Sequence, residues 1–225
     1  MKINIAIDGP SAAGKSTIAK LLAKKLGYVH LDTGAMYRCT ALKAKKEGIA
    51  LDDEAGVCAM LEKTDITLTP EGEVFLDGEN VSDAIRTDEI SLAASAVSKM
   101  KKVREDLVAR QQKMAEDKGF IMDGRDIGTV VLKDAEVKIF MTASAEARAM
   151  RRYLQNKEKG LPLSNVETIA EEIRQRDYED THRANSPLRK ADDAVELDTS
   201  ELTIDEVVAA MMRIVEPAIA GEKQG

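Results

Sequence analysis

Nine consecutive residues near the start of the chain have the types and the spacing needed to bind a row of phosphate groups. They fit the pattern G-x-x-x-x-G-K-[ST], in which glycines leave backbone N–H groups unshielded, the lysine acts as a point charge and the hydroxyl ligates a metal ion. We therefore expect ATP with Mg²⁺ here, with Lys15 at the β and γ phosphates and Ser16 on the metal. The nine residues are Gly9, Pro10, Ser11, Ala12, Ala13, Gly14, Lys15, Ser16 and Thr17.

The segments on either side of this loop are those that the chemistry requires. The apolar residues 3–7 predict a buried strand before the loop, and residues 18–26 have the composition of a helix after it. A helix that begins at the loop adds its positive dipole end to the backbone donors. A chance glycine turn before a helix is the alternative, and the strand, loop and helix in this order make it the weaker one.

A second group of charged residues follows the apolar residues 120–122. Asp123, Arg125 and Asp126 stand there with two glycines, at the carboxyl end of a predicted buried strand, where open α/β sheets bind ligands. We expect Asp123 to help order Mg²⁺ and its water, and Arg125 to grip an acceptor phosphate through two parallel hydrogen bonds. A structural ion pair between Asp123 and Arg125 is the alternative.

Two predicted helices carry arginines on one face. Arg176, Asp180 and Arg183 are spaced i, i+4 and i+7, so they share a helix face. Taken singly, each would be a solvated surface charge. Beside a phosphate loop, such arginines favour a clamp for a phosphoryl group in transfer. The preceding helix adds Arg148, Arg151 and Arg152.

A third candidate phosphate site lies at residues 32–38, which follow a short strand and open a helix. The hydroxyl of Thr33, a glycine and Arg38 come together there at a helix N-terminus. An ordinary helix cap with a solvated arginine explains this segment equally well when it is taken alone.

The order of the elements predicts an α/β fold, a doubly wound parallel sheet of five strands. Strand-like runs alternate with helical segments, and residues 65–81 differ from them in having short β segments with Pro and Gly turns, which predicts a small antiparallel insert. Ser164 with Glu167, and Thr203 with Glu206, have the spacing of capping boxes and predict two helix starts. The five runs are residues 3–7, 28–31, 120–122, 137–141 and 194–197.

Composition disfavours several classes of partner. The formal net charge of −7 opposes general attraction to nucleic acid polymers and to anionic membranes, and with 3% aromatic residues and no Trp there is little to stack on bases. The two cysteines have no C-x-x-C spacing, which favours reduced thiols over a zinc site. We expect a cytoplasmic monomer whose partners are small molecules.

The combination of motifs resembles that of the bacterial cytidylate kinases, which are nucleoside monophosphate kinases of the P-loop fold. The resemblance extends over essentially all 225 residues, and the insert at 65–81 resembles the longer bacterial form. It implies transfer of a phosphoryl group from ATP to CMP or dCMP, giving ADP and CDP or dCDP. The motifs that carry it are residues 9–17, 32–38, 85–87, 103–105, 123–131, 137–140 and 176–183.

The resemblance also implies a division of the chain into three parts within a single kinase unit. The core would comprise residues 1–33, 105–148 and 184–225. The insert that binds the nucleoside monophosphate would run from about 34 to 104, and a short helical lid with its flanking helices from about 149 to 183.

Site residues carried over by the resemblance fall into groups by what they would contact. Ser95, Arg104 and Asp126 would read the cytosine edge. The CMP phosphate would be held by Arg38, Arg125 and Arg183, with Thr33 nearby, and the ribose by Arg176 and Asp180. Many relatives have Ser where this chain has Thr33, which leaves the fit of dCMP open. Arg148, Arg151 and Arg152 would lie on the lid side. The catalytic set would be Lys15, Arg125, Arg151, Arg152 and Arg183.

Two other readings of the same residues stay open at this stage. One is a different small-molecule P-loop kinase, acting on UMP, AMP or a hydroxylated metabolite. The other is a nucleotide-dependent switch in which ATP only orders a surface, although the absence of an N-K-x-D pattern argues against a GTPase. No general base stands out, which agrees with a phosphate acceptor, because a monophosphate with a second pKa of about 6 is already mostly ionised at pH 7.

Overall fold

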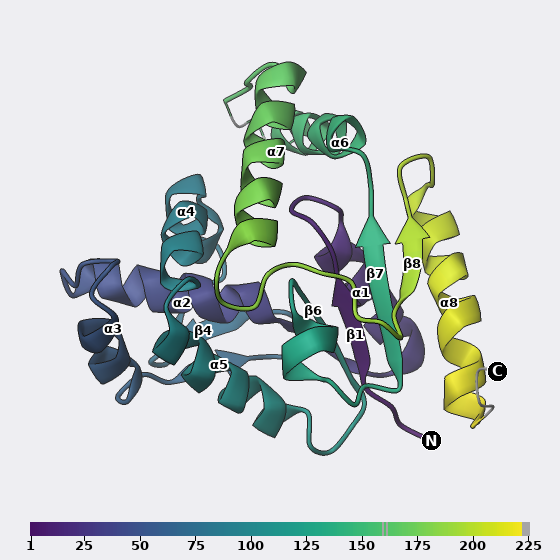
Figure 1. Ribbon diagram of the computed structural model, residues 1–225, viewed down its shortest axis with the longest axis horizontal. Coiled ribbons are helices and arrows are strands. Elements are labelled where there is room, and N and C mark those ends of the chain that lie inside the picture. Colours follow the sequence, from purple (N-terminus) through teal and green to yellow (C-terminus); the bar gives the residue numbers. More distant parts are fainter. Residues whose placement is uncertain (159, 161, 222–225) are drawn as a thin grey trace. The chain divides into compact units, whose positions relative to one another are not determined.

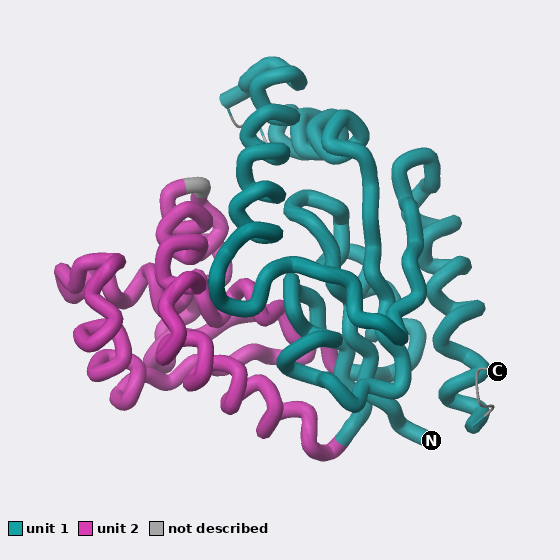
Figure 2. The backbone as a smooth tube through the Cα atoms, viewed as in Figure 1, with its two compact units in different colours: residues 1–28, 118–225 teal, residues 29–117 magenta. Residues whose placement is uncertain are grey.

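The computed structural model describes residues 1–158, 160 and 162–221, which form two compact units (Figure 2). Unit 1 contains residues 1–28 and 118–225, and unit 2 contains residues 29–117. Positions 159 and 161 of the predicted lid and positions 222–225 of the predicted core lie outside the described residues.

The main sheet has five strands in the order β2-β6-β1-β7-β8 (Figure 1). Parallel pairing joins β1 to β6 and β7, and joins β7 to β8. The predicted α/β fold with a five-stranded parallel sheet is confirmed. Its strands are β1 (Ile5–Asp8), β2 (Val29–Asp32), β6 (Phe120–Gly124), β7 (Val137–Thr142) and β8 (Val195–Asp198).

The central strand β1 is buried along its whole length because it has a neighbour on each side and helices against one face. Ile5 lies between Ile121 and Val137 in the register. These apolar side chains form one cluster with α1 (Lys15–Leu26) and α8 (Ile204–Ala220), which therefore cover the same face of the sheet. Packing of this kind fixes the end of β1, where the phosphate loop begins.

Helices α6 (Ala145–Glu158) and α7 (Val166–His182) pack against each other in unit 1. Their contact is a small apolar cluster of Ala149, Ile169, Ala170 and Ile173, and Ala12 of the phosphate loop packs against the same cluster. A π-helical turn, η2 (Ile127–Val131), follows β6.

The two predicted capping boxes had different outcomes. The box at Thr203 is confirmed, since its hydroxyl accepts from the Glu206 N–H and the Glu206 side chain accepts from the Thr203 N–H. The prediction of a capping box at Ser164 was wrong. Asn165 caps α7 instead, because its side-chain oxygen accepts from the Thr168 N–H at 2.7 Å and asparagine is as good a cap as serine.

Unit 2 has its own apolar core, built from its helices and one face of a three-stranded sheet. The sheet is antiparallel in the order β3-β4-β5, which confirms the small antiparallel element predicted at residues 65–81. Within the described residues of the whole chain, no helix is long and apolar enough to cross a bilayer. The elements are α2 (Thr33–Lys46), α3 (Glu54–Leu61), β3 (Ile66–Leu68), β4 (Val74–Leu76), β5 (Glu79–Asn80), η1 (Ala84–Arg86), α4 (Asp88–Val97) and α5 (Lys101–Met114).

Gly9 is required where the phosphate loop leaves β1. Its φ is +150°, and a Cβ added there would lie 2.0 Å from the backbone oxygen of Met141 on β7. Because that oxygen belongs to the backbone of a buried strand, it cannot move aside as the end of a side chain could. A glycine at this position therefore sets how closely the loop approaches the sheet.

We predict that Gly9→Ala lowers the free energy of unfolding by more than about 3 kcal/mol, because it adds a backbone clash to an unfavourable φ. Gly48→Ala is the matched control, since Gly48 also has a positive φ of +69° but open space around its Cβ position. That change should cost about 1 to 2 kcal/mol. Urea unfolding of both variants tests this, and equal losses would contradict the close approach at Met141.

Candidate active site

The phosphate loop ends at the N-terminus of α1 with a left-handed turn. Gly14 caps the helix with φ +88°, and Ala12 also has a positive φ of +56°, which is uncommon outside glycine. The first turn of α1 contains no acidic residue. The loop backbone and the positive end of the helix thus form a site suited to anions.

Lys15 is buried, and its ammonium donates to the backbone oxygens of Gly9 at 2.8 Å and Pro10 at 2.6 Å. Burial, and to a smaller extent the charge of Arg125, lower the pKa of Lys15 to about 7. The carboxylates of Asp123 and Asp8 offset only part of this effect. A polyanion bound at the loop would raise the pKa of this buried lysine, because new negative charge favours the protonated form.

The two residues expected at the metal are in direct contact. The hydroxyl of Ser16, in the first turn of α1, donates to Asp123 Oδ2 at 2.7 Å, at the carboxyl end of β6. A hydroxyl oxygen and a carboxylate are hard ligands of the kind that Mg²⁺ prefers. Within the described residues, no group of three or more His, Cys, Asp or Glu side chains could hold a metal ion.

Asp8 has a role that the sequence analysis missed. Its two carboxylate oxygens accept from the backbone N–H groups of Ile127 and Gly128, each at 2.7 Å. Burial raises the pKa of Asp8 to about 6, although these two hydrogen bonds act in the opposite direction. Asp8 therefore fixes the turn that follows Arg125 and Asp126. The available signal was a carboxylate at the end of an otherwise apolar strand.

Four predicted acceptor residues come together in unit 1. Arg125 Nε bonds Asp180 Oδ2 at 2.7 Å, and Arg183 Nη1 lies 4.0 Å from Asp180 Oδ1. Arg183 Nη2 lies 3.8 Å from Asp126 Oδ1, while its Nε donates to the Ser186 carbonyl oxygen at 2.7 Å. Two segments distant in sequence thus place two arginines and two carboxylates side by side.

The charge balance in this cluster favours the ionised form of Asp180. Burial is the largest single effect and acts to raise the pKa of Asp180, but the arginines Arg125, Arg183 and Arg176 together outweigh it, Arg125 most of all, and hold the pKa below its usual value. Arg176 is half-buried, one helical turn before Asp180 on α7. Asp180 therefore keeps the arginines in place as a charged partner.

The arginines of α6 differ in environment. Arg148 is buried and supports the phosphate loop through the Ser11 carbonyl oxygen at 2.9 Å. Arg151 bonds Thr199 and the carbonyl oxygen of Ser200, after β8. Arg152 is half-buried on the same helix. Of the three, Arg151 and Arg152 remain candidates for contact with a phosphoryl group.

Two further residues predicted to bind the acceptor phosphate, Thr33 and Arg38, belong to unit 2. Asp32 caps α2 by accepting from the Ala35 N–H at 3.0 Å, and it also binds Arg38 Nη2 at 2.7 Å. Thr33, the first residue of α2, is buried. The structure therefore places Thr33 and Arg38 at one helix end.

Arg104 lies on α5 and contacts α2 through an aromatic ring. Its guanidinium carbon is 5.5 Å from the centre of the Tyr37 ring, and its Nη1 donates to the Ser98 carbonyl oxygen at 3.3 Å. Ser95 is half-buried on α4, one turn before Ser98. The residues expected to read cytosine in this unit therefore come from neighbouring helices of one core.

Comparison with known proteins decides the family. The sequence matches the model of the cytidylate kinase family over residues 5–217. A cytidylate kinase of Bacillus licheniformis is 53% identical over 219 residues, which is 96% of this chain and 96% of that protein. The chain belongs to the cytidylate kinase family. The cytidylate kinase of Bacillus subtilis is 52% identical over 218 residues, 96% of this chain and 97% of that protein.

Solved structures outside the cytidylate kinase family share the fold. A gluconokinase from Sinorhizobium meliloti 1021 has a TM-score of 0.51 at 14% identity, covering 99% of this chain and 98% of its own. A shikimate kinase from Bacteroides thetaiotaomicron has a TM-score of 0.51 at 13% identity, covering 96% and 99%. At such low identity these likenesses show the fold alone.

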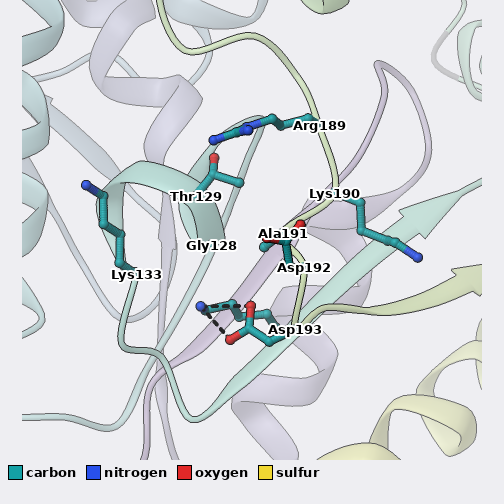
Figure 3. A pocket seen from close by; sticks show the side chains of 9 residues that line it. Gly128, Thr129, Lys133, Arg189, Lys190, Ala191, Asp192 and Asp193 are labelled. Atoms are coloured by element: carbon teal, nitrogen blue, oxygen red, sulfur yellow. Dashed lines mark hydrogen bonds and ion pairs between the residues drawn. The ribbon is translucent and has the colours of Figure 1, made fainter.

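Unit 1 of this cytidylate kinase family member also has a hollow of about 240 Å³ whose lining includes no residue of the phosphate loop (Figure 3). In it Lys138 bonds both oxygens of Asp193, at 3.0 and 2.7 Å, and Arg189 reaches over Thr129. The hollow lies beside the turn that Asp8 holds, but none of its lining residues belongs to the predicted site. Its lining residues are Gly128, Thr129, Lys133, Lys138, Arg189, Lys190, Ala191, Asp192 and Asp193.

We predict that Lys15→Met changes how the stability of the protein depends on pH. Because the pKa of Lys15 is about 7 in the folded chain and 10.5 as a free side chain, the unfolded state binds more protons between those values. Burial of Lys15 therefore destabilises the folded state fully below about pH 7, and this destabilisation is lost as the pH rises from 7 to about 10.5. Relative to wild type, the variant should gain about 1 kcal/mol for each pH unit lowered from 10 to 7.

Urea unfolding of protein free of nucleotide and metal, at several pH values from 6 to 10, measures this difference. Lys20→Met is the control, since Lys20 is exposed on the same helix. Stability curves of Lys15→Met and wild type that run parallel across the window would show that Lys15 keeps an ordinary pKa.

Proposed function

We propose that this chain transfers the γ-phosphoryl group of ATP to CMP or dCMP, giving ADP and CDP or dCDP. The observation that carries the proposal is a complete phosphate loop, with Lys15 buried in it and Ser16 on Asp123, in a member of the cytidylate kinase family. Relatives that bear the name cytidylate kinase are 50 to 53% identical over nearly the whole chain.

On the donor side, backbone N–H groups of the loop and the first turn of α1 bind the phosphates of ATP. Lys15 exchanges its carbonyl partners, Gly9 and Pro10, for phosphate oxygens. The negative charge of the phosphates raises the pKa of Lys15 again, so the bound state keeps a full positive charge where the transferring group gains negative charge.

Ser16 and Asp123 are the residues that would hold Mg²⁺, Asp123 directly or through water. Their contact at 2.7 Å places a hydroxyl and a carboxylate at one point next to the loop, and Mg²⁺ in kinases commonly takes only one or two protein ligands besides phosphates and water. When bound, Mg²⁺ neutralises charge on the β and γ phosphoryl oxygens.

On the acceptor side, Arg125 and Arg183 bind the phosphate of CMP, together with Arg38 and the hydroxyl of Thr33. Arg176 and Asp180 contact the ribose. The acceptor oxygen needs no catalytic base, because a monophosphate is mostly ionised at neutral pH. Transfer then depends on alignment of two phosphates and on positive charge around the moving group, to which Arg151 and Arg152 contribute.

Discrimination of the base rests on Asp126, Arg104 and Ser95. Cytosine presents an exocyclic amino donor beside two acceptors, so a carboxylate and an arginine satisfy both kinds of group. Uracil places an oxygen where cytosine has the amino group, which leaves the buried carboxylate of Asp126 without a donor. We therefore propose CMP and dCMP over UMP.

The proposal also includes the division of the chain into core, insert and lid, the oligomeric state of the protein and its location in the cell. Residues at about 34–104 form the insert for the monophosphate, and residues at about 149–183 form the lid with its flanking helices. The protein acts as a monomer in the cytoplasm on small nucleotides.

We predict that ADP release coupled to a spectroscopic assay is stimulated most by CMP and dCMP, and much less by UMP and AMP. Lys15→Ala should lower turnover with CMP by several orders of magnitude while the fold is kept, because the charge on the moving group loses its nearest cation. The proposed reaction would be contradicted if UMP or AMP gave faster ADP release than CMP and dCMP. Slow ATP hydrolysis that none of the four monophosphates stimulates would contradict it as well.

We predict separately that Asp126→Asn lowers the ratio of kcat/KM for CMP to that for UMP by about tenfold or more, because an amide can donate to the uracil oxygen as well as accept from the cytosine amino group. Asp134→Asn, at an exposed aspartate in the same unit, should leave the ratio unchanged. Steady-state kinetics with both acceptors give the ratio, and an unchanged value in Asp126→Asn would remove Asp126 from base recognition.

A further inference from the structure

Two side chains from distant helices hold the backbone of Ser11 in the phosphate loop. The Ser11 N–H donates to Asp177 Oδ1 at 3.3 Å, and the Ser11 carbonyl oxygen accepts from Arg148 Nη1 at 2.9 Å. Asp177 lies on α7 and Arg148 on α6. Both polar backbone groups of Ser11 are therefore fixed from outside the loop.

The two side chains also hold each other. Arg148 Nη2 bonds Asp177 Oδ2 at 2.7 Å, and Arg148 Nε donates to the Ala143 carbonyl oxygen at 2.8 Å. The side chain of Arg148 is 6% exposed and that of Asp177 is 22% exposed. Each oxygen of Asp177 thus has a partner, and the pair is shielded enough for its charge-assisted bonds to be strong.

The loop needs such support because its backbone is strained at the next residue. Ala12 has φ +56°, a conformation that costs an L-residue about 1 kcal/mol or more. Its side chain packs against the apolar cluster between α6 and α7. The packing of Ala12 and the bonds to Ser11 act together on the segment whose N–H groups would face phosphate.

Asp177 is next in sequence to Arg176 and one turn before Asp180, the residues proposed to contact the acceptor ribose. Helix α7 therefore carries acceptor residues and a support of the donor loop within one turn. Asp177 therefore connects α7 directly to the backbone of Ser11.

We propose that Asp177 is a positioning residue for the donor site: with Arg148 it fixes the backbone of Ser11 in the form that binds the phosphates of ATP. This inference rests on the proposed function for the identity of the donor, and it goes beyond that function in assigning a role to Asp177. Asp177 does not touch the nucleotide, because both of its oxygens are taken by Ser11 and Arg148.

The test is the affinity of the full-length protein for ATP with Mg²⁺ and, separately, for CMP, measured by titration calorimetry. In Asp177→Ala the dissociation constant of ATP should rise by about tenfold or more, because a charged hydrogen bond to the loop and the partner of Arg148 are both lost. The dissociation constant of CMP should change by less than about threefold, because the residues proposed to bind CMP are unchanged.

Glu172→Ala is the matched control, a carboxylate removed from an exposed position on the same helix, and it should leave both affinities unchanged. Asp177→Asn keeps an acceptor for the Ser11 N–H but loses the charge that pairs with Arg148, so its loss of ATP affinity should lie between those of wild type and Asp177→Ala. Asp177→Asn also decides the matter if Asp177→Ala does not fold.

A selective loss of ATP affinity in folded variants supports the positioning role. Equal losses for ATP and CMP would indicate a merely structural role, and unchanged ATP affinity would show that Ser11 is set without Asp177; either result overturns the inference. The proposed function fails separately, if wild-type protein that binds ATP does not phosphorylate CMP.

Discussion

Charge buried next to the phosphate loop is the constraint on which the site depends. Lys15, Asp8, Asp123, Arg148 and Asp180 are all largely removed from water, and a buried charge without a partner is costly. Each one is therefore held by a specific donor or acceptor, and those partners come from the phosphate loop itself, α1, α7 and the turn after β6. The loop is shaped by the surrounding charges as much as by its own glycines.

The shifted pKa values follow from the same constraint. Burial lowers the pKa of Lys15 to about 7 and raises the pKa of Asp8 to about 6, so both shifts move toward the neutral form of the group. The pKa of Asp180 is instead lowered, toward the charged form, because Arg125 together with Arg183 and Arg176 outweighs burial. The site thus keeps its carboxylate charged where arginines need a counter-ion, and keeps its lysine ready to gain charge from an incoming anion.

Much of the fold could be predicted from local patterns, whereas much of the support for the site could not. The strands, the phosphate loop, the antiparallel insert and the cap at Thr203 are set by residues close in sequence, so spacing alone predicts them. Asp8 and Asp177 were missed because the backbone N–H groups that donate to them lie 119 or more residues away in sequence, and a lone carboxylate gives no sign of a distant backbone N–H. The cap of α7 was misplaced by one residue because Ser164 and Asn165 are both good caps and only packing chooses between them.

The hydrogen bonds from Arg148 on α6 and to Asp177 on α7 that hold the Ser11 backbone also have a consequence for folding during synthesis. A nascent chain that has emerged only as far as residue 140 already contains the entire phosphate-binding motif, yet it lacks both side chains that hold the Ser11 backbone. Since chains are made from the N-terminus, the phosphate-binding motif leaves the ribosome before the two side chains that hold its backbone. If Asp177 positions the loop as proposed, we expect an incomplete chain to bind nucleotide tightly only once α7 has been made.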